Sequence, residues 1–371
     1  MGRKKKGSKN IFENSLLSQM KATPLVSVNM PVYNGERFIK EAIESILAQS
    51  FADFELVIVN DGSTDNTVSI IGQFNDPRIK LVHNKNKTGL AHVRNIALTN
   101  SIGKYIAILD SDDVAFPERL QLQVDFLEKN EKYALVCGGI DIIDAEGNIT
   151  GAEAYTYSDD EIGPALFFHN CIAQSSVMLR KSMLPSTEPY DPAFPPSEDY
   201  HLWIRLSKKY PMHIIKKPLI KYRKHAFNTS SERKEHTDNM VSKVLKLQCD
   251  ELGLTYLTKD DLGLILALVY DCYNGERAFV ASLNKLYQEI IKANRKHKRY
   301  PAPIFEKLIK GYMNKTLPLF FVRKRYGSQE LKDLFGTSVN AAFYLPAGRL
   351  VKLIAKCMIY YKTRRLSNNN K

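Results

Sequence analysis

The sequence lacks the features typical of zinc-binding, secreted or membrane-spanning proteins. Its five cysteines are odd in number and far apart, and none forms a CxxC pair or a Cys/His set with zinc spacing. Free thiols in a reducing compartment are therefore expected. No apolar run approaches the roughly 18 residues of a transmembrane helix, and LGLILALVY (262–270) is too short. The basic start MGRKKKGSKN lacks a following apolar segment, so no secretory signal is expected.

Several nucleotide-binding and hydrolytic motifs are also missing. A dinucleotide-binding fold needs Gly-x-Gly-x-x-Gly after its first strand, but the corresponding loop, PVYNGE (31–36), has one glycine. This argues against a dehydrogenase. Neither a Walker sequence nor a Gly-x-Ser-x-Gly elbow is present, which argues against P-loop nucleotidases and α/β-hydrolases.

Acidic residues are scarce in the last third of the chain. The whole chain has a net charge of +13, yet residues 1–239 sum to −1 and residues 240–371 to +14. This asymmetry predicts a near-neutral working domain joined to a basic one that contacts something anionic.

Strand-like apolar stretches alternate with segments of helical periodicity from Pro24 onward. The expected strands are 25–31, 54–61, 79–84 and 105–110, and the expected helices are 35–51, 63–74 and 90–101. Such alternation predicts an α/β fold with a mostly parallel central sheet and helices on both faces, which binds ligands at the carboxyl ends of its strands. Ser63 or Thr64 is the expected N-cap of the second helix.

Three units are predicted. Residues 1–23 form a basic, disordered segment, and residues 24–240 form the α/β domain, in which the pattern becomes mixed after about residue 133. Residues 241–371 read as helical and rich in lysine, without strand character.

The apolar strand YIAILD (105–110) runs directly into a cluster of carboxylates at Asp110, Asp112 and Asp113. Like charges so close repel one another unless a cation or solvent lies among them. Asp110 and Asp112 alternate around Ser111, so they can share one Mg²⁺ or Mn²⁺, which prefer such hard oxygen ligands. A solvated, inert cluster is the alternative interpretation.

Other polar residues follow the remaining strands. Asp61 ends a buried strand and needs a partner there. Tyr33 lies at the mouth of the expected site, where it can stack on a base or merely pack its loop. Arg94 can meet a phosphate or Asp61, or form a structural ion pair.

A second acidic pair, Glu198 and Asp199, begins an expected helix in SEDYHLW. Helix capping explains such a pair, because the helix dipole favours carboxylates at that end. A general base that deprotonates a hydroxyl is the functional alternative. His225, in YRKH, is a candidate metal or diphosphate ligand or part of an exposed basic loop.

Taken together, these motifs resemble glycosyltransferase family 2. The resemblance spans about residues 24–230 and rests on six segments in order: VSVNMPVYNGERFIKEAIESILAQSF, ELVIVNDGSTDNT, GLAHVRNIAL, YIAILDSDDVAFPERL, SSVMLRKS and SEDYHLWIRL. It implies an inverting enzyme of the GT-A fold that uses a nucleotide-sugar donor and a divalent metal, Mn²⁺ or Mg²⁺, as cofactor.

The resemblance also implies roles for individual residues. Asp199 would be the catalytic base with Glu198 as its neighbour, and Asp112, Asp110 and His225 would hold the metal. The nucleotide would be bound by Pro31, Tyr33, Asp61, Arg94 and Ser111. The sugar and acceptor side would include Gln174, Ser175 and Trp203. The chain departs from the family pattern at Lys87, Asn60 and Gln174, which leaves the donor sugar open.

The basic third lies outside the resemblance. In RLVKLIAKCMIYYKTRRLS (349–367), Arg349, Lys352 and Lys356 share one helical face, which suits an anionic membrane surface. A helical subdomain with a solvated basic face is the alternative. Because no recognised nucleic-acid module is present, no nucleic-acid partner is expected.

The sequence therefore predicts an inverting, metal-dependent glycosyltransferase at the cytoplasmic face of a membrane. It would move a hexosyl or N-acetylhexosaminyl group, from a UDP-sugar, to a glycan or lipid-linked acceptor in cell-surface polysaccharide synthesis. Two rivals remain: a GT-A scaffold without turnover, and a nucleotidyltransferase, which would release pyrophosphate.

Overall fold

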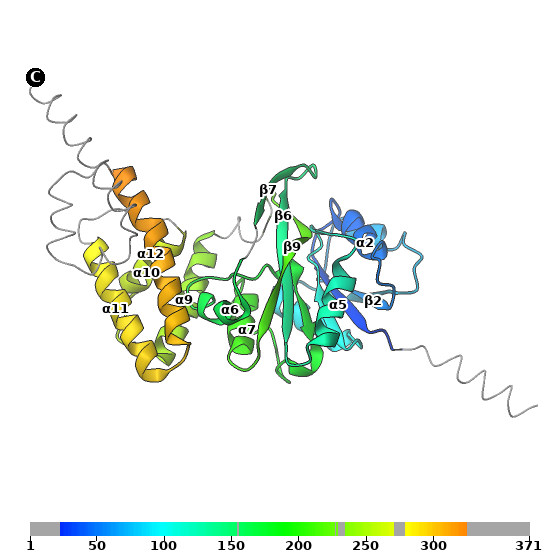
Figure 1. The fold of residues 1–371 in the computed structure, drawn as a ribbon. Coiled ribbons are helices and arrows are strands. Elements are labelled where there is room, and N and C mark those ends of the chain that lie inside the picture. Colours follow the sequence, from blue (N-terminus) through cyan, green and yellow to red (C-terminus); the bar gives the residue numbers. More distant parts are fainter. Residues whose placement is uncertain (1–22, 154–155, 227, 229–233, 271–278, 325–371) are drawn as a thin grey trace, which may run out of the picture.

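The structure is a computed structural model that describes residues 23–153, 156–226, 228, 234–270 and 279–324 (Figure 1). Nearly all of the basic segment predicted for residues 1–23, and the whole of the basic helix predicted near residues 349–367, lie outside these described residues. Within them, no helix combines the length and the apolar character needed to cross a bilayer.

The described strands form one sheet, in the order β3-β2-β1-β4-β8-β6-β9-β5, with β7 paired to β6 beside that path. Their bounds are β1 Val26–Val32, β2 Phe54–Asn60, β3 Ile79–His83, β4 Tyr105–Ile108, β5 Val114–Ala115, β6 Leu135–Ile143, β7 Ile149–Glu153, β8 Met178–Arg180 and β9 Met212–Arg223. The first four strands in the sequence are parallel, as predicted. Beyond β4 the sheet is mixed, because β8 runs antiparallel to both β4 and β6, whereas β6 and β9 are parallel.

Helices cover both faces of the sheet and then form a separate layer. The bounds are α2 Ile39–Leu47, α3 Thr67–Ile71, α4 Leu90–Asn100, α5 Arg119–Lys129, α6 Asp159–Ala165, α7 Glu198–Ser207, α9 Lys234–Glu251, α10 Lys259–Tyr270, α11 Phe279–His297 and α12 Ala302–Lys324, with short 3-10 turns at Gln174–Ser176 and Lys181–Met183. Helices α6 and α7 lie between the sheet and α9–α12 (Figure 1). The domain boundary predicted near residue 240 falls inside α9. The division of the chain into three units stays a prediction.

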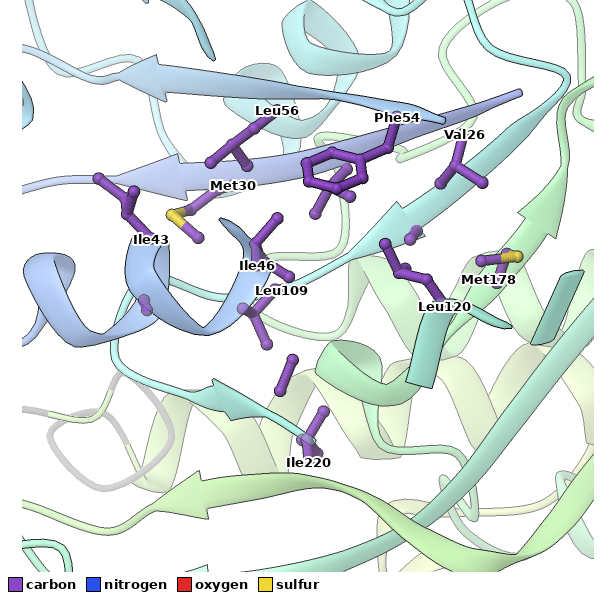
Figure 2. Close-up of a cluster of buried hydrophobic side chains, with 14 of the residues drawn as sticks. Val26, Met30, Ile43, Ile46, Phe54, Leu56, Leu109, Leu120, Met178 and Ile220 are labelled. Carbon is purple, nitrogen blue, oxygen red and sulfur yellow. The ribbon is translucent and has the colours of Figure 1, made fainter. Parts of the chain in front are cut away.

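Alternating side chains of each strand supply two cores. On one face, Met30 and Leu56 pack with Ile43 and Ile46 of α2 (Figure 2). This is the face predicted from the helical spacing of the apolar residues in that helix. On the other face of β2, Val57 and Val59 pack against α4. Two-sided burial is why these strands read as continuous apolar runs.

The N-cap prediction for the second helix is wrong. Helix α3 begins only at Thr67, after Asn66, and makes no side-chain cap hydrogen bond. The Ser63 hydroxyl instead accepts a hydrogen bond from the Asn34 backbone N–H at 2.9 Å, and the Thr64 N–H donates to Asn34 Oδ1 at 2.9 Å. The polar groups expected to cap a helix therefore join the loops that follow β1 and β2.

Gly103 marks a close approach between the start of β4 and β1. A Cβ at this position would lie 2.6 Å from the backbone nitrogen of Ser27, so the backbone would have to shift. We predict that Gly103→Ala lowers the free energy of unfolding by about 1–3 kcal/mol, measured by urea titration. The matched control is Gly263→Ala in α10, where a Cβ meets nothing within 4 Å. A Gly103→Ala protein as stable as the parent would contradict the tight approach.

Candidate active site

A cavity of about 1010 Å³ opens at the carboxyl edge of β1, β2 and β4. Eleven of the thirteen site residues predicted from the sequence line it: Pro31, Tyr33, Asp61, Arg94, Asp110, Ser111, Asp112, Gln174, Ser175, Asp199 and His225. Glu198 is fully buried and is not among the lining residues, but it pairs with Arg94, which lines the cavity. Trp203 is not brought to the cavity, because its ring lies fully buried in the core beneath α7, where a large apolar side chain is most stabilised.

Asp61 organises the loop that leads into α4. Its carboxylate accepts hydrogen bonds from the Thr88 N–H at 2.9 and 3.0 Å, the Thr88 hydroxyl at 2.8 Å, the Gly89 N–H at 3.0 Å and Asn84 Nδ2 at 3.1 Å. Gly89 has a φ of 97°, which favours glycine. These bonds give the buried carboxylate the partners it requires. Its predicted contact with a nucleobase stays a prediction.

Tyr33 presents its ring at the mouth of the cavity and is 40% exposed. The ammonium of Lys87 lies 3.6 Å from the centroid of this ring. A cation over an aromatic face is electrostatically attracted to it. The sequence marks Lys87 only as a departure from the family pattern and gives no signal for its contact with Tyr33.

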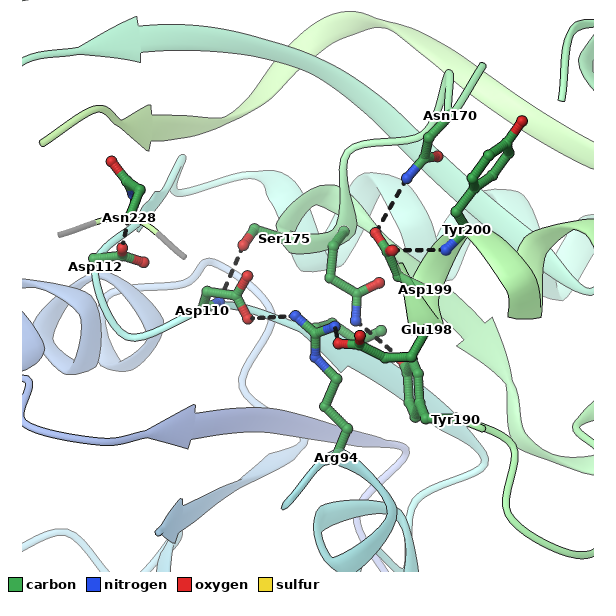
Figure 3. Close-up of polar contacts among 12 residues, drawn as sticks. Arg94, Asp110, Asp112, Asn170, Ser175, Tyr190, Glu198, Asp199, Tyr200 and Asn228 are labelled. Atoms are coloured by element: carbon green, nitrogen blue, oxygen red, sulfur yellow. Dashed lines mark hydrogen bonds and ion pairs between the residues drawn. The ribbon is translucent and has the colours of Figure 1, made fainter. Parts of the chain in front are cut away.

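Arg94 joins the two acidic motifs (Figure 3). Its guanidinium, on α4, pairs with Glu198 at 2.5 Å and with Asp110 at 3.3 Å. The pairing with Asp61 considered from the sequence is not observed. Burial acts to lower the pKa of Arg94, but the charges of Asp110 and Glu198 outweigh it and the pKa is raised. Burial has the opposite effect on the acid: it raises the pKa of Glu198 to about 7, although the positive charge of Arg94 acts to lower that pKa.

Asp199 lies in the first turn of α7 and is held from two sides (Figure 3). Its Oδ1 accepts the backbone N–H of Tyr200 at 2.6 Å, and its Oδ2 accepts Nδ2 of Asn170 at 3.1 Å. Burial raises the pKa of Asp199, while Arg94 and these hydrogen bonds act in the opposite direction. A raised pKa makes this carboxylate a stronger base, which suits it to accept a proton.

The three carboxylates that follow β4 have three different partners. Asp110 pairs with Arg94, and its backbone N–H donates to the Ser175 hydroxyl at 3.1 Å. Asp113 is fully buried and accepts the backbone N–H of Arg223 at 2.9 Å. Burial, reinforced by the charges of Asp112 and Asp110, raises the pKa of Asp113 well above its usual range. Asp113, which had no role in the sequence analysis, therefore ties this loop to the end of β9.

Asp112 faces His225 and Asn228. Its Oδ2 lies 3.0 Å from His225 Nε2 and accepts Nδ2 of Asn228 at 3.3 Å. Asn228 Oδ1 also accepts the backbone N–H of His225 at 2.6 Å, which orients the histidine. Asn228 was missed because an amide three residues after a histidine carries no distinctive sequence signal.

The donor atoms of Asp112 and His225 fit a divalent cation. In the part of the chain that the structure describes, no cluster of three or more His, Cys, Asp or Glu side chains is arranged to hold a metal. Mg²⁺ sites commonly use one or two protein carboxylates together with substrate phosphates. Two converging protein donors, within a cluster of like charges, suit an ion that is shared with a diphosphate.

We predict that Arg94→Met lowers the free energy of unfolding by about 3–5 kcal/mol, because it leaves Glu198 buried without its counter-charge. Urea titration at pH 7 measures this loss. The double variant Arg94→Met/Glu198→Gln should recover part of it, since the stranded charge is gone. A double variant less stable than Arg94→Met alone would contradict the account.

Comparison with known proteins places this geometry in a family. The model of Glycosyl transferase family 2 matches residues 27–184. The fold resembles residues 1–349 of TarS from S. aureus, with a TM-score of 0.52, 20% identity, and coverage of 81% of this chain and 87% of that one. This likeness confirms the predicted GT-A fold class.

Relatives are also found by sequence. An uncharacterized glycosyltransferase of Haemophilus influenzae is 31% identical over 284 residues, covering 73% of this chain and 86% of the relative. WfgD of Escherichia coli, a UDP-Glc:alpha-D-GlcNAc-diphosphoundecaprenol beta-1,3-glucosyltransferase, is 34% identical over 235 residues, covering 62% of this chain and 85% of WfgD. On these matches the chain belongs to glycosyltransferase family 2 and is, as the sequence predicted, a glycosyltransferase.

Proposed function

We propose that this enzyme transfers a sugar from a nucleoside diphosphate to an acceptor hydroxyl with inversion at the anomeric carbon. One observation carries the proposal: Asp199 lines the same cavity as the Asp112–His225 pair. Asp199 is suited to receive a proton, and Asp112 and His225 would hold a cation that neutralises the charge of a leaving diphosphate. These are the two tasks that transfer from an activated donor requires.

Asp199 acts as the general base. It accepts the proton of the acceptor hydroxyl while that oxygen forms a bond to the anomeric carbon. The bond to the diphosphate oxygen breaks in the same displacement, and its electron pair leaves with the nucleoside diphosphate. A single displacement inverts the configuration and needs no covalent nucleophile. Arg94 and Glu198 keep the base and Asp110 at a fixed separation.

A divalent cation, Mn²⁺ or Mg²⁺, would be held by Asp112 and His225, with Asp110 beside them. When bound, it neutralises charge on the departing diphosphate. The nucleotide would contact Pro31, Tyr33, Asp61, Arg94 and Ser111. Gln174 and Ser175 would face the sugar, and Gln174 suits that role because its Oε1 is buried without a partner while its Nε2 donates to Tyr190 at 3.0 Å.

Similarity to WfgD supports a UDP-sugar donor and a lipid-linked acceptor, because the name of that relative specifies both. We therefore infer a role in cell-surface polysaccharide synthesis, with a hexosyl or N-acetylhexosaminyl group transferred. The acceptor would enter on the side of Asp199, where Asn170, Ile172 and Pro196 also line the cavity.

A peripheral location at the cytoplasmic face of the membrane follows from the same acceptor class and from the basic third of the chain. In α11 and just after it, Lys292, Lys296 and Lys298 are exposed, whereas Arg295 and Arg299 pair with acidic side chains.

We expect the full chain to float with vesicles containing phosphatidylglycerol and to be released by high salt, because basic residues are attracted to anionic lipid within a Debye length. Equal flotation with purely zwitterionic vesicles, or none with either, would reject the electrostatic contact.

The central prediction concerns Asp199→Asn, which keeps the shape of the side chain but removes its ability to accept a proton. Assayed with a panel of UDP-sugars, Mn²⁺ and a lipid-linked acceptor, this variant should lose about 10²–10⁴-fold in kcat. UDP binding, followed by thermal shift, should persist. Asp125→Asn is the control, because Asp125 lies on the exposed surface of α5, where it accepts the Gln121 amide at 2.8 Å.

The outcomes separate the rival functions. Full activity of Asp199→Asn would remove the proposed base, and release of pyrophosphate in place of a nucleoside diphosphate would indicate a nucleotidyltransferase. Failure of the parent protein to bind any donor with Mn²⁺ present would favour a scaffold without turnover.

A further inference from the structure

Asn170 contacts the carboxylate of Asp199 and has its own orientation fixed. Its Oδ1 accepts the backbone N–H of Ile172 at 3.2 Å, so its Nδ2 is directed at Asp199 Oδ2, 3.1 Å away. The other oxygen of Asp199 is engaged by Tyr200. The hydrogen bond from the Asn170 amide therefore restrains the position of Asp199 Oδ2 (Figure 3).

The segment before Asn170 is embedded in the helices that follow the α/β domain. Phe167 and Phe168 are fully buried in the apolar cluster of α9–α12, and each ring centroid lies 5.4 Å from that of Phe305 in α12. The carbonyl of Leu166 accepts Nε2 of Gln248, in α9, at 3.1 Å.

His169 completes this attachment. Its Nε2 lies 3.0 Å from the hydroxyls of both Tyr312, in α12, and Tyr157. The two hydroxyls are 3.1 Å apart. A residue adjacent to Asn170 is thus joined to the helical layer by polar contacts among three side chains that all lie within hydrogen-bonding distance of one another.

We propose that Asn170 is a positioning residue for Asp199, and that α9–α12 hold it in place through residues 166–169. This rests on the proposed function, in which Asp199 is the base. The helical layer thereby contributes to catalysis from behind the α/β domain. Five other groups act on the charge of Asp199: Arg94 from α4, the backbone N–H of Tyr200, Asp110 after β4, Glu198 from α7 and Tyr190. None of them belongs to the helical layer.

The test compares Asn170→Ala and Asn170→Asp with the parent. Loss of the donated hydrogen bond should reduce kcat about ten-fold or more, with the KM for the donor and UDP binding unchanged. Because that bond lowers the pKa of Asp199, its loss raises the pKa, and the ascending limb of the kcat–pH profile should move to higher pH. Asn170→Asp should move it further, because a like charge then faces the base.

Asn148→Ala is the matched control. Asn148 Nδ2 also donates to an aspartate, Asp144 Oδ2 at 3.1 Å, but in an exposed turn outside the cavity. Its kcat and pH profile should equal those of the parent. Asn170→Asp retains the size of the side chain and the acceptor for Ile172, so it guards against a simple failure to fold. If both Asn170 variants keep the parental kcat and pH profile while Asp199→Asn is inactive, the positioning role is overturned and the proposed function stands.

The helical contribution has its own test. Tyr312→Phe removes the hydroxyl that meets His169 and should lower kcat about two- to ten-fold without changing the donor KM. Tyr256→Phe is the control, since the Tyr256 hydroxyl bonds Glu289 at the exposed surface of the helical layer. A parental kcat in Tyr312→Phe would overturn the support by α12.

Discussion

The ion pairs of Arg94 are the constraint on which the rest of the site depends. One buried guanidinium bridges a carboxylate just after β4, 16 residues from Arg94 in the sequence, and another at the start of α7, 104 residues from Arg94. Removing such a charge from water is costly unless its partners are well aligned, so the three side chains hold one another in a single arrangement. The distance between the Asp110 side and the Asp199 side of the cavity follows from that arrangement.

The repulsion among the carboxylates that follow β4 is reduced because each carboxylate has a different partner. Asp110 is neutralised by Arg94, and Asp113 is buried against the backbone of Arg223, which itself pairs with Glu41. Asp112 lies beside His225, and both Asp110 and Asp112 line the cavity. Each carboxylate of the loop thus has its own partner, which limits the repulsion among the three.

Much of this was predictable because the relevant signals are local. The β/α alternation and the loops that end β1, β2 and β4 follow from periodicity, and the six ordered motifs bring most site residues to one edge. What periodicity cannot supply is the choice of partner: Arg94 had several carboxylates within conceivable reach, and only the packing of α7 selects Glu198. Ser63 and Thr64 are capping residues by type, but Asn34 offered them better-placed partners. Trp203 follows the acidic motif in sequence yet points into the core.

The Asp199 side of the cavity is supported by a part of the chain outside the family resemblance. The sheet and α4 orient Asp110 and Arg94 through strand ends and buried ion pairs, but Asn170 lies in an irregular segment between α6 and the turn at Gln174–Ser176. Backbone hydrogen bonds order the start of this segment as a turn, in which Phe168 and His169 donate to the Ala165 carbonyl. Burial of Phe167 and Phe168 and the contact of His169 with α12 add to that order. Since hydrophobic burial is non-directional, while hydrogen bonds at His169 and Asn170 are directional, the two together fix both the depth and the orientation of the segment. The basic helices therefore have a physical reason to accompany this catalytic domain that is separate from the charge they carry.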